Sequence, residues 1–224
     1  MKVIGIYGNP KDGGFVHGCM DAIAKRLEER DVVVERLHLR EQGILDCTGC
    51  FTCLRTGSCV LDDPMNGICE RMRQADGYVI GCSVRNGYAT ALYKKFYERI
   101  TYPLIFTGDM TGKFVLSVSA VGKMGGRGAT SKLLGLAGTG AYHAGGLFFH
   151  TGIPTRLTVD AARVGLERAA DRFLERYGAG WRPGPLWRLA RRVDHFVMKR
   201  LLFAKSPETY RHVIECYRRR GWMK

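Results

Sequence analysis

The chain opens with KVIGIY at Lys2–Tyr7 and runs directly into GNPKDGG at residues 8–14. The first stretch is a short β-branched and apolar run, which predicts a buried strand. The second is rich in Gly, Pro, Asn and Asp, which predicts a loop. A helical pattern follows over about residues 16–30. A strand, a glycine loop and a helix in this order are typical of a parallel α/β sheet.

The rest of the chain repeats this alternation. Four more strands are predicted, over residues 32–39, 77–82, 113–120 and 146–150. Helical patterns lie over residues 65–75, 89–99, 130–137 and 160–177. Right-handed crossovers between such strands give a parallel sheet with helices on both faces. We therefore expect a three-layer α/β domain with five parallel strands over residues 1–178, followed by a helical extension over residues 179–224.

Composition narrows the class of protein. The 224 residues are 46% hydrophobic and 25% charged, which is globular composition and excludes a disordered, collagen-like or coiled-coil chain. No uncharged apolar run reaches the roughly 18 residues of a membrane span, and the N-terminal stretch is no secretory signal, so a cytoplasmic location is expected. The net charge of +14 predicts an anionic cofactor or partner.

The glycine loop at residues 8–14 lies where such folds bind ligands, at the carboxyl edge of the sheet. Its backbone N–H groups and the following helix N-terminus form an anion site. The dinucleotide fingerprint G-x-G-x-x-G and the Walker pattern are both absent. A compact loop around the single phosphate of a mononucleotide such as FMN fits better, and a plain strand-to-helix turn is the alternative.

Four of the eight cysteines form the pattern C-x2-C-x2-C-x5-C, at Cys47, Cys50, Cys53 and Cys59. In a reducing compartment, clustered cysteines indicate metal or redox chemistry. This spacing is typical of ferredoxin-type [4Fe–4S] loops, whereas structural zinc sites separate two knuckles by about 12–20 residues. Zinc and free thiols remain alternatives. Cys19, Cys69 and Cys82 are expected to be buried thiols, and Cys216 has no assigned role.

The segment after residue 178 differs in composition. A Gly- and Pro-rich linker at 178–185 precedes apolar residues at helical spacing with arginines between them. Residues 182–224 contain 12 Lys/Arg and three Asp/Glu, so they carry +9 of the +14. The apolar stripe is expected to pack on the core or across a dimer. Contact of the tail with an anionic membrane surface or with nucleic acid is an alternative.

Three segments in this order resemble the iron–sulfur flavoproteins, which belong to the NADPH-dependent FMN reductase group with a flavodoxin-like fold. The segments are the GNPKDGG loop, the cysteine pattern with LDDPM at residues 61–65, and GCSVRNG at residues 81–87. The resemblance implies an FMN-dependent oxidoreductase with a [4Fe–4S] cluster on the four clustered cysteines. It also implies NAD(P)H or ferredoxin as electron donor, a small-molecule or protein acceptor, and a homodimer or homotetramer.

The resemblance also assigns the FMN-binding residues by position. The phosphate would be held by Gly8, Asn9, Pro10, Lys11, Gly13, Gly14, Phe15 and Val16. The flavin ring would lie along Ser83, Val84, Arg85, Asn86 and Gly87, and its edge along Val121 and Gly122. Asn9 and Lys11 stand where the family usually has Ser and Arg. Arg85 is either a positive charge beside the flavin N1/O2 edge or a solvated loop residue.

Two other functions remain open at this stage. One is an NAD(P)H-dependent FMN or quinone reductase without an iron–sulfur cluster, in which the cysteines hold zinc or nothing. The other is a non-enzymatic module that its basic tail recruits. No catalytic acid–base residue is assigned, because in this class the protein mainly positions and tunes its cofactors. The histidines show no metal-ligand spacing, and nothing supports hydrolase chemistry.

Overall fold

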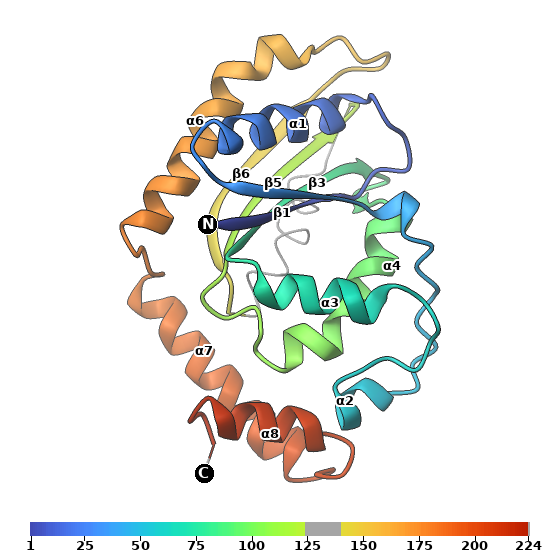
Figure 1. Cartoon of the computed structure of the whole chain (residues 1–224), viewed down its shortest axis with the longest axis vertical. Coiled ribbons are helices and arrows are strands. Elements are labelled where there is room, and N and C mark those ends of the chain that lie inside the picture. Colours follow the sequence, from blue (N-terminus) through green and yellow to red (C-terminus); the bar gives the residue numbers. More distant parts are fainter. Residues whose placement is uncertain (124–139, 224) are drawn as a thin grey trace.

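The computed structural model describes residues 1–123 and 140–223. Its sheet has five parallel strands in the order β2-β1-β3-β5-β6 (Figure 1). The strands are β1 Lys2–Tyr7, β2 Val33–His38, β3 Gly77–Arg85, β5 Phe114–Val121 and β6 Tyr142–His150. The predicted parallel sheet is confirmed, and β1 has the bounds that its apolar run predicts.

Two strands extend beyond their predicted bounds. β3 continues to Arg85 and turns back as the two-residue antiparallel strand β4, Tyr88–Ala89. The turn falls at Asn86 and Gly87, both with positive φ, as a tight hairpin requires. β6 starts at Tyr142, four residues earlier than predicted, and pairs with β5 along its length. Its start was missed because glycines are poor strand formers and weaken the sequence pattern. The helix predicted at residues 130–137 lies outside the described residues.

Helices cover both faces of the sheet. α1 (Phe15–Glu28) and α6 (Val159–Gly178) pack side by side on one face, and α3 (Met65–Gln74) and α4 (Ala91–Ile100) cover the other (Figure 1). Each face has its own buried apolar cluster. The three-layer architecture is therefore the predicted one.

The loop after β1 is fixed by a close approach of helix to strand. Gly81 of β3 has no room for a Cβ, which would lie 2.3 Å from Cγ of Met20 in α1. The Gly81 carbonyl accepts a hydrogen bond from the Gly8 N–H at 2.7 Å. Gly8 and Gly81 together therefore allow the start of the β1 loop to lie directly against β3.

The C-terminal extension packs against the cysteine segment. Its helices are α7 (Pro185–Val197), which continues as a π-helical turn at Met198–Phe203, and α8 (Arg211–Arg219). Buried side chains of Phe203, Val213 and Tyr217 contact Leu54 on the short helix α2 (Thr52–Thr56). The tail therefore packs on the loop that carries the cysteines, with α8 beside α2 in Figure 1.

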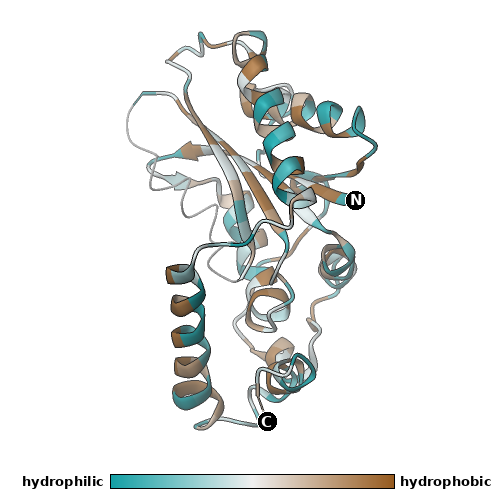
Figure 2. Ribbon diagram, turned by 90° about the vertical axis from the view of Figure 1, so that its left-hand side faces the viewer, coloured by the Kyte–Doolittle hydropathy of each residue, from teal (hydrophilic) through white to brown (hydrophobic). Residues whose placement is uncertain are grey.

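α7 uses only one of its faces within the chain. Its inward side includes His195, whose ring lies 4.5 Å from that of Trp222. The outward side chains are 52–81% exposed; they are Leu186, Leu189, Val193 and Phe196 of α7, with Leu201 in the π-helical turn that continues it. Figure 2 shows these apolar turns along a helix that lies apart from the sheet. The expected packing of this stripe on the chain's own core is therefore not found in the described residues.

No helix within residues 1–123 and 140–223 combines the length and apolar character that crossing a bilayer requires.

Candidate functional site

A cavity of about 380 Å³ opens at the carboxyl edge of the sheet, between the end of β3 and the loops that follow β1, β5 and β6. Ten of the fifteen residues assigned to FMN line it: Asn9, Pro10, Lys11, Gly14, Phe15, Val16, Ser83, Val84, Arg85 and Gly122. The structure thus brings the β1 loop and the end of β3 together at one cavity.

The other five assigned residues do not line this cavity. Gly8 faces the protein interior, where a Cβ would lie 3.0 Å from the Gly81 carbonyl oxygen, and its own carbonyl accepts a hydrogen bond from Thr90. Gly8 therefore positions the loop. Asn86 and Gly87 form the hairpin turn, Gly13 takes a positive φ, and Val121 packs with Val84 in a small apolar cluster.

One wall of the cavity was not predicted. Thr151–Thr155 follows β6 and contains the cis peptide Ile153–Pro154. Thr151 is buried and donates both its N–H and its hydroxyl to the Val121 carbonyl, and Ile153 covers Gly122, where a Cβ would lie 2.6 Å from it. The sequence could have indicated this wall only through its place after a predicted strand, since loops after parallel strands lie at the ligand-binding edge of the sheet.

The first turn of α1 offers an anion site at this cavity. Gly14 caps the helix without a side-chain hydrogen bond, and the first turn contains no acidic residue. The N–H groups and the positive end of the helix dipole are therefore available to an anion. Lys11 and Arg85 line the same cavity. Asn9 joins its two sides, because its Oδ1 accepts a hydrogen bond from the Ser83 N–H at 2.8 Å. These groups fit a phosphate ester.

The four clustered cysteines meet at a second pocket, between α2 and the end of α4. The chain reverses direction here through positive φ angles at Gly49, Phe51 and Gly57. Burial, and then the charges of the other three thiols, raises the pKa of Cys53 to about 11. Hydrogen bonds with Thr52 and Thr48 lower the pKa of the exposed Cys50 to about 7. The pattern therefore folds into one four-thiol site.

The four cysteine side chains on one pocket are a donor set for a metal group. Thiolates hold both tetrahedral zinc and the corners of a [4Fe–4S] cluster. The consecutive x2 spacing of Cys47, Cys50 and Cys53 favours the cluster, because structural zinc sites usually separate two knuckles by about 12–20 residues. The residues present therefore fit a [4Fe–4S] cluster.

A buried ion pair between Arg99 and Asp63 stabilises the segment that carries the cysteines. The side chains of Arg99 on α4 and Asp63 are only 1% and 2% exposed, and their atoms Nη1 and Oδ2 lie 2.6 Å apart. Asp63 also accepts hydrogen bonds from the Leu45 and Met65 N–H groups. Burial favours the neutral acid, but the hydrogen bonds from Arg99 and then from the two N–H groups outweigh it and hold the pKa of Asp63 below its ordinary value. The Arg99 Nη2 donates to the Cys59 Sγ at 3.3 Å.

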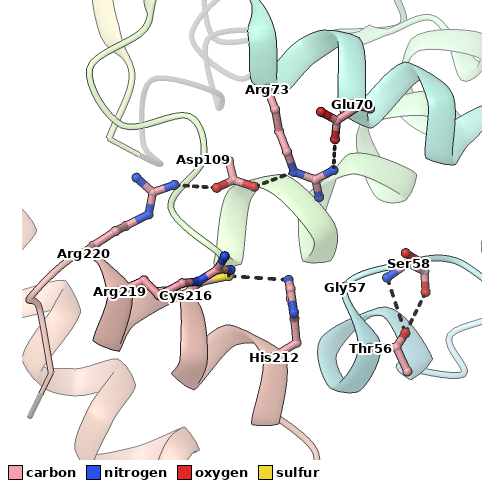
Figure 3. A pocket seen from close by; sticks show the side chains of 10 residues that line it. All are labelled: Thr56, Gly57, Ser58, Glu70, Arg73, Asp109, His212, Cys216, Arg219 and Arg220. Atoms are coloured by element: carbon pink, nitrogen blue, oxygen red, sulfur yellow. Dashed lines mark hydrogen bonds and ion pairs between the residues drawn. The ribbon is translucent and has the colours of Figure 1, made fainter.

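A third cavity, of about 420 Å³, lies where the tail meets α2 and α3 (Figure 3). Asp109 bridges Arg73 on α3 and Arg220 at the end of α8. Cys216 is buried beside His212 at 3.4 Å and accepts from Arg219 at 3.1 Å. The His212 ring occupies the space that a Cβ at Gly57 would take. These contacts hold the tail against the cysteine segment.

The remaining cysteines are buried, as predicted. Cys19, Cys69 and Cys82 lie in the core. Burial raises the pKa of Cys19 and Cys69 to about 12, so they stay protonated at neutral pH. They therefore behave as small apolar side chains.

Comparison with solved structures defines the class of fold. The chain is similar to an NAD(P)H:quinone oxidoreductase from Methanothermobacter marburgensis, with TM-score 0.57, 15% identity, and 77% of this chain and 94% of that one covered. A flavodoxin from the domain Archaea gives TM-score 0.52 at 13% identity, with 79% and 98% covered. The fold is flavodoxin-like, as the resemblance implied.

Comparison of sequences gives the family. The model of the family described as NADPH-dependent FMN reductase matches residues 1–152, so the chain belongs to this family of flavin-dependent oxidoreductases. An iron–sulfur flavoprotein of Archaeoglobus fulgidus is 32% identical over 126 residues, which are 55% of this chain and 57% of that protein. The chain thus spans little more than half of the length of this relative.

Replacing Asp63 with Asn tests the ion pair. The amide keeps the shape of the side chain but leaves the Arg99 charge buried without its partner, which costs about 3–5 kcal/mol of the free energy of unfolding. Urea denaturation of the two proteins measures this cost. Asp62→Asn, at the exposed neighbouring position, is the control and is expected to change stability by less than about 0.5 kcal/mol. Equal effects of the two variants would contradict the structural role of Asp63.

Proposed function

We propose that the protein is an FMN-dependent electron-transfer oxidoreductase that also holds a [4Fe–4S] cluster on Cys47, Cys50, Cys53 and Cys59. Electrons would pass between NAD(P)H or a reduced ferredoxin, FMN, the cluster and a small-molecule or protein acceptor. The observation that carries the proposal is the convergence of four thiols on one pocket in a chain whose sheet edge forms an anion-binding cavity.

The two groups would supply the electron chemistry, with FMN exchanging hydride or single electrons and the cluster single electrons. The chain's own residues bind and tune them. The α1 N-terminus and Lys11 would hold the phosphate, and Arg85 would add positive charge at the cavity. Arg99, which donates to Cys59, would lower the electron density on that ligand and thereby favour the reduced cluster.

The anaerobically purified protein is expected to contain one FMN and about four irons with four sulfides per chain. Cys53→Ser is expected to lose the iron and sulfide and keep the FMN, because Cys53 lies in the thiol pocket and does not line the flavin cavity. Metal, sulfide and flavin analysis of one sample measures all three quantities.

Cys69→Ala is the control for this experiment, since Cys69 is buried in the core outside the thiol pocket. It is expected to retain both cofactors. Flavin without iron in the wild-type protein would instead support a simple FMN or quinone reductase. A wild-type protein that contains no flavin and no iron would contradict the enzymatic proposal. The non-enzymatic module recruited by its basic tail would then be favoured.

Gly14→Asp is expected to separate helix stability from FMN binding. The φ of −80° and the open space at Gly14 accept an aspartate, whose carboxylate caps α1 and stabilises the helix slightly. The same negative charge at the phosphate position is expected to weaken FMN binding at least about tenfold. Flavin fluorescence titration and thermal melting measure the two effects.

The matched control is Gly14→Asn, which caps the helix without adding charge. Its FMN affinity is expected to stay within about threefold of wild type. If Asp and Asn weaken FMN binding equally, the effect is steric, and the anion site is not at the α1 N-terminus.

We also infer that the protein is a homodimer or homotetramer in which the outward face of α7 is covered by a second copy. The support is the row of five exposed apolar side chains on one helix face, which an isolated chain leaves in water. The basic residues of this tail make an anionic membrane surface or nucleic acid the competing occupants.

Replacing Leu189 and Phe196 with Ser is expected to dissociate the oligomer, because it removes the centre of the apolar face. Light scattering after size-exclusion chromatography measures the mass. Val164→Ser is the control, since Val164 is 60% exposed on α6 and lies outside this face. A wild-type monomer would contradict the inference, and binding of that monomer to anionic vesicles or to DNA would identify the other occupant.

A further inference from the structure

A cluster of two histidines and one aspartate lies where the β1 loop, the first turn of α1 and the end of β2 meet. Asp12, His17 and His38 each offer one ligand atom, and the three atoms all lie within 4.8 Å of one another. Asp12 belongs to the glycine loop, His17 to the first turn of α1, and His38 is the last residue of β2. None of the three lines the flavin cavity or the thiol pocket.

The fold brings these residues together through strand register. β1 and β2 are parallel, and Tyr7 is paired with His38 at their carboxyl ends. The Tyr7 ring stacks on the His38 imidazole with centroids 4.3 Å apart, and the His17 ring lies 5.3 Å from that of His38. The two imidazoles thus meet although 21 positions separate them in the sequence, which is why no spacing motif revealed them.

A carboxylate lies beside each ring nitrogen of His17. The His17 Nδ1 lies 3.8 Å from the Asp12 Oδ1, while its Nε2 lies 3.5 Å from the Asp21 Oδ2. Asp21 in turn accepts a hydrogen bond from the Tyr7 hydroxyl at 2.7 Å. An imidazole that binds a metal through one nitrogen usually directs its other nitrogen at a carboxylate, and Asp21 lies on that side of His17.

Asp12 is oriented in a similar way. Its Oδ2 is paired with the Arg40 guanidinium at 2.7 Å, which leaves Oδ1 on the side of His17. One oxygen is therefore available to a metal while the other is neutralised. Two imidazoles and one carboxylate oxygen make a donor set that favours first-row transition ions over Ca²⁺ or Mg²⁺.

We propose that Asp12, His17 and His38 form a binding site for one divalent transition-metal ion of the zinc type, with the remaining position open to water. Asp21 and Arg40 act as positioning residues. A bound ion would tie the loop that carries Asn9 and Lys11 to the ends of α1 and β2. The proposal goes beyond the proposed function and does not depend on it, because the site uses none of the FMN-cavity or cysteine residues.

Cobalt titration of the full chain tests the site, since Co²⁺ replaces zinc and its spectrum reports its ligands. Anaerobic protein is first treated with iodoacetamide, which blocks any clustered thiol that no metal holds, and its spectrum before cobalt addition is subtracted. The expected result is one Co²⁺ per chain with visible d–d bands and no thiolate-to-cobalt charge-transfer band. Zinc is expected to displace it. Thiolate charge transfer as the sole signal, or no saturable binding, would overturn the proposal, whatever the FMN and iron contents are.

Single variants assign the ligands. His17→Gln and His38→Gln are each expected to weaken Co²⁺ binding at least about tenfold, and Asp21→Asn by about 10–100-fold through loss of the support for His17. His143→Gln, at an exposed position of β6, is the control and is expected to bind as wild type does. Circular dichroism confirms that each variant is folded. Unchanged binding in both folded ligand variants would overturn the assignment.

Discussion

The buried ion pair between Asp63 and Arg99 is the interaction on which the cysteine segment depends. Residues 45–63 contain one short helix and little else that is regular, so few backbone hydrogen bonds hold their path. Asp63 and Arg99 take the place of such backbone hydrogen bonds. The Asp63 carboxylate accepts hydrogen bonds from the backbone on either side of it, and the Arg99 guanidinium donates to the Leu45 carbonyl and the Cys59 sulfur. An apolar pair of equal volume would pack as well but would leave these polar groups without partners.

The same helix carries the constraint to the flavin cavity. α4 begins after Thr90, whose hydroxyl caps the helix and donates to the Gly8 carbonyl in the β1 loop, and its last turn contains Arg99. Ten residues of α-helix span about 15 Å. One rigid element therefore fixes the glycine loop at one end and the thiol site at the other. The position of the thiol site relative to the glycine loop is therefore set by α4 more than by either loop alone.

The sequence predicted what depends on local pattern. The bounds of β1, the glycine loop and the four-cysteine motif could be read from composition and spacing. What escaped prediction depends on contacts distant in the sequence. Thr151–Thr155 reaches the cavity because β6 lies beside β5, and His17 meets His38 because β1 and β2 are in register. Asp63 lay within a segment that the resemblance singled out, but its role required the position of Arg99.

The basic tail shows how one composition can serve two purposes. In α8 and the residues after it, positive charge is used within the chain: Arg220 pairs with Asp109, and Arg219 donates to Cys216. In the described residues, Arg188 and Arg192 of α7 have no carboxylate partner and flank an exposed apolar face. The net charge of this segment therefore combines two different uses of arginine. α8 packs on the cysteine segment, whereas α7 keeps an exposed apolar face between exposed arginines.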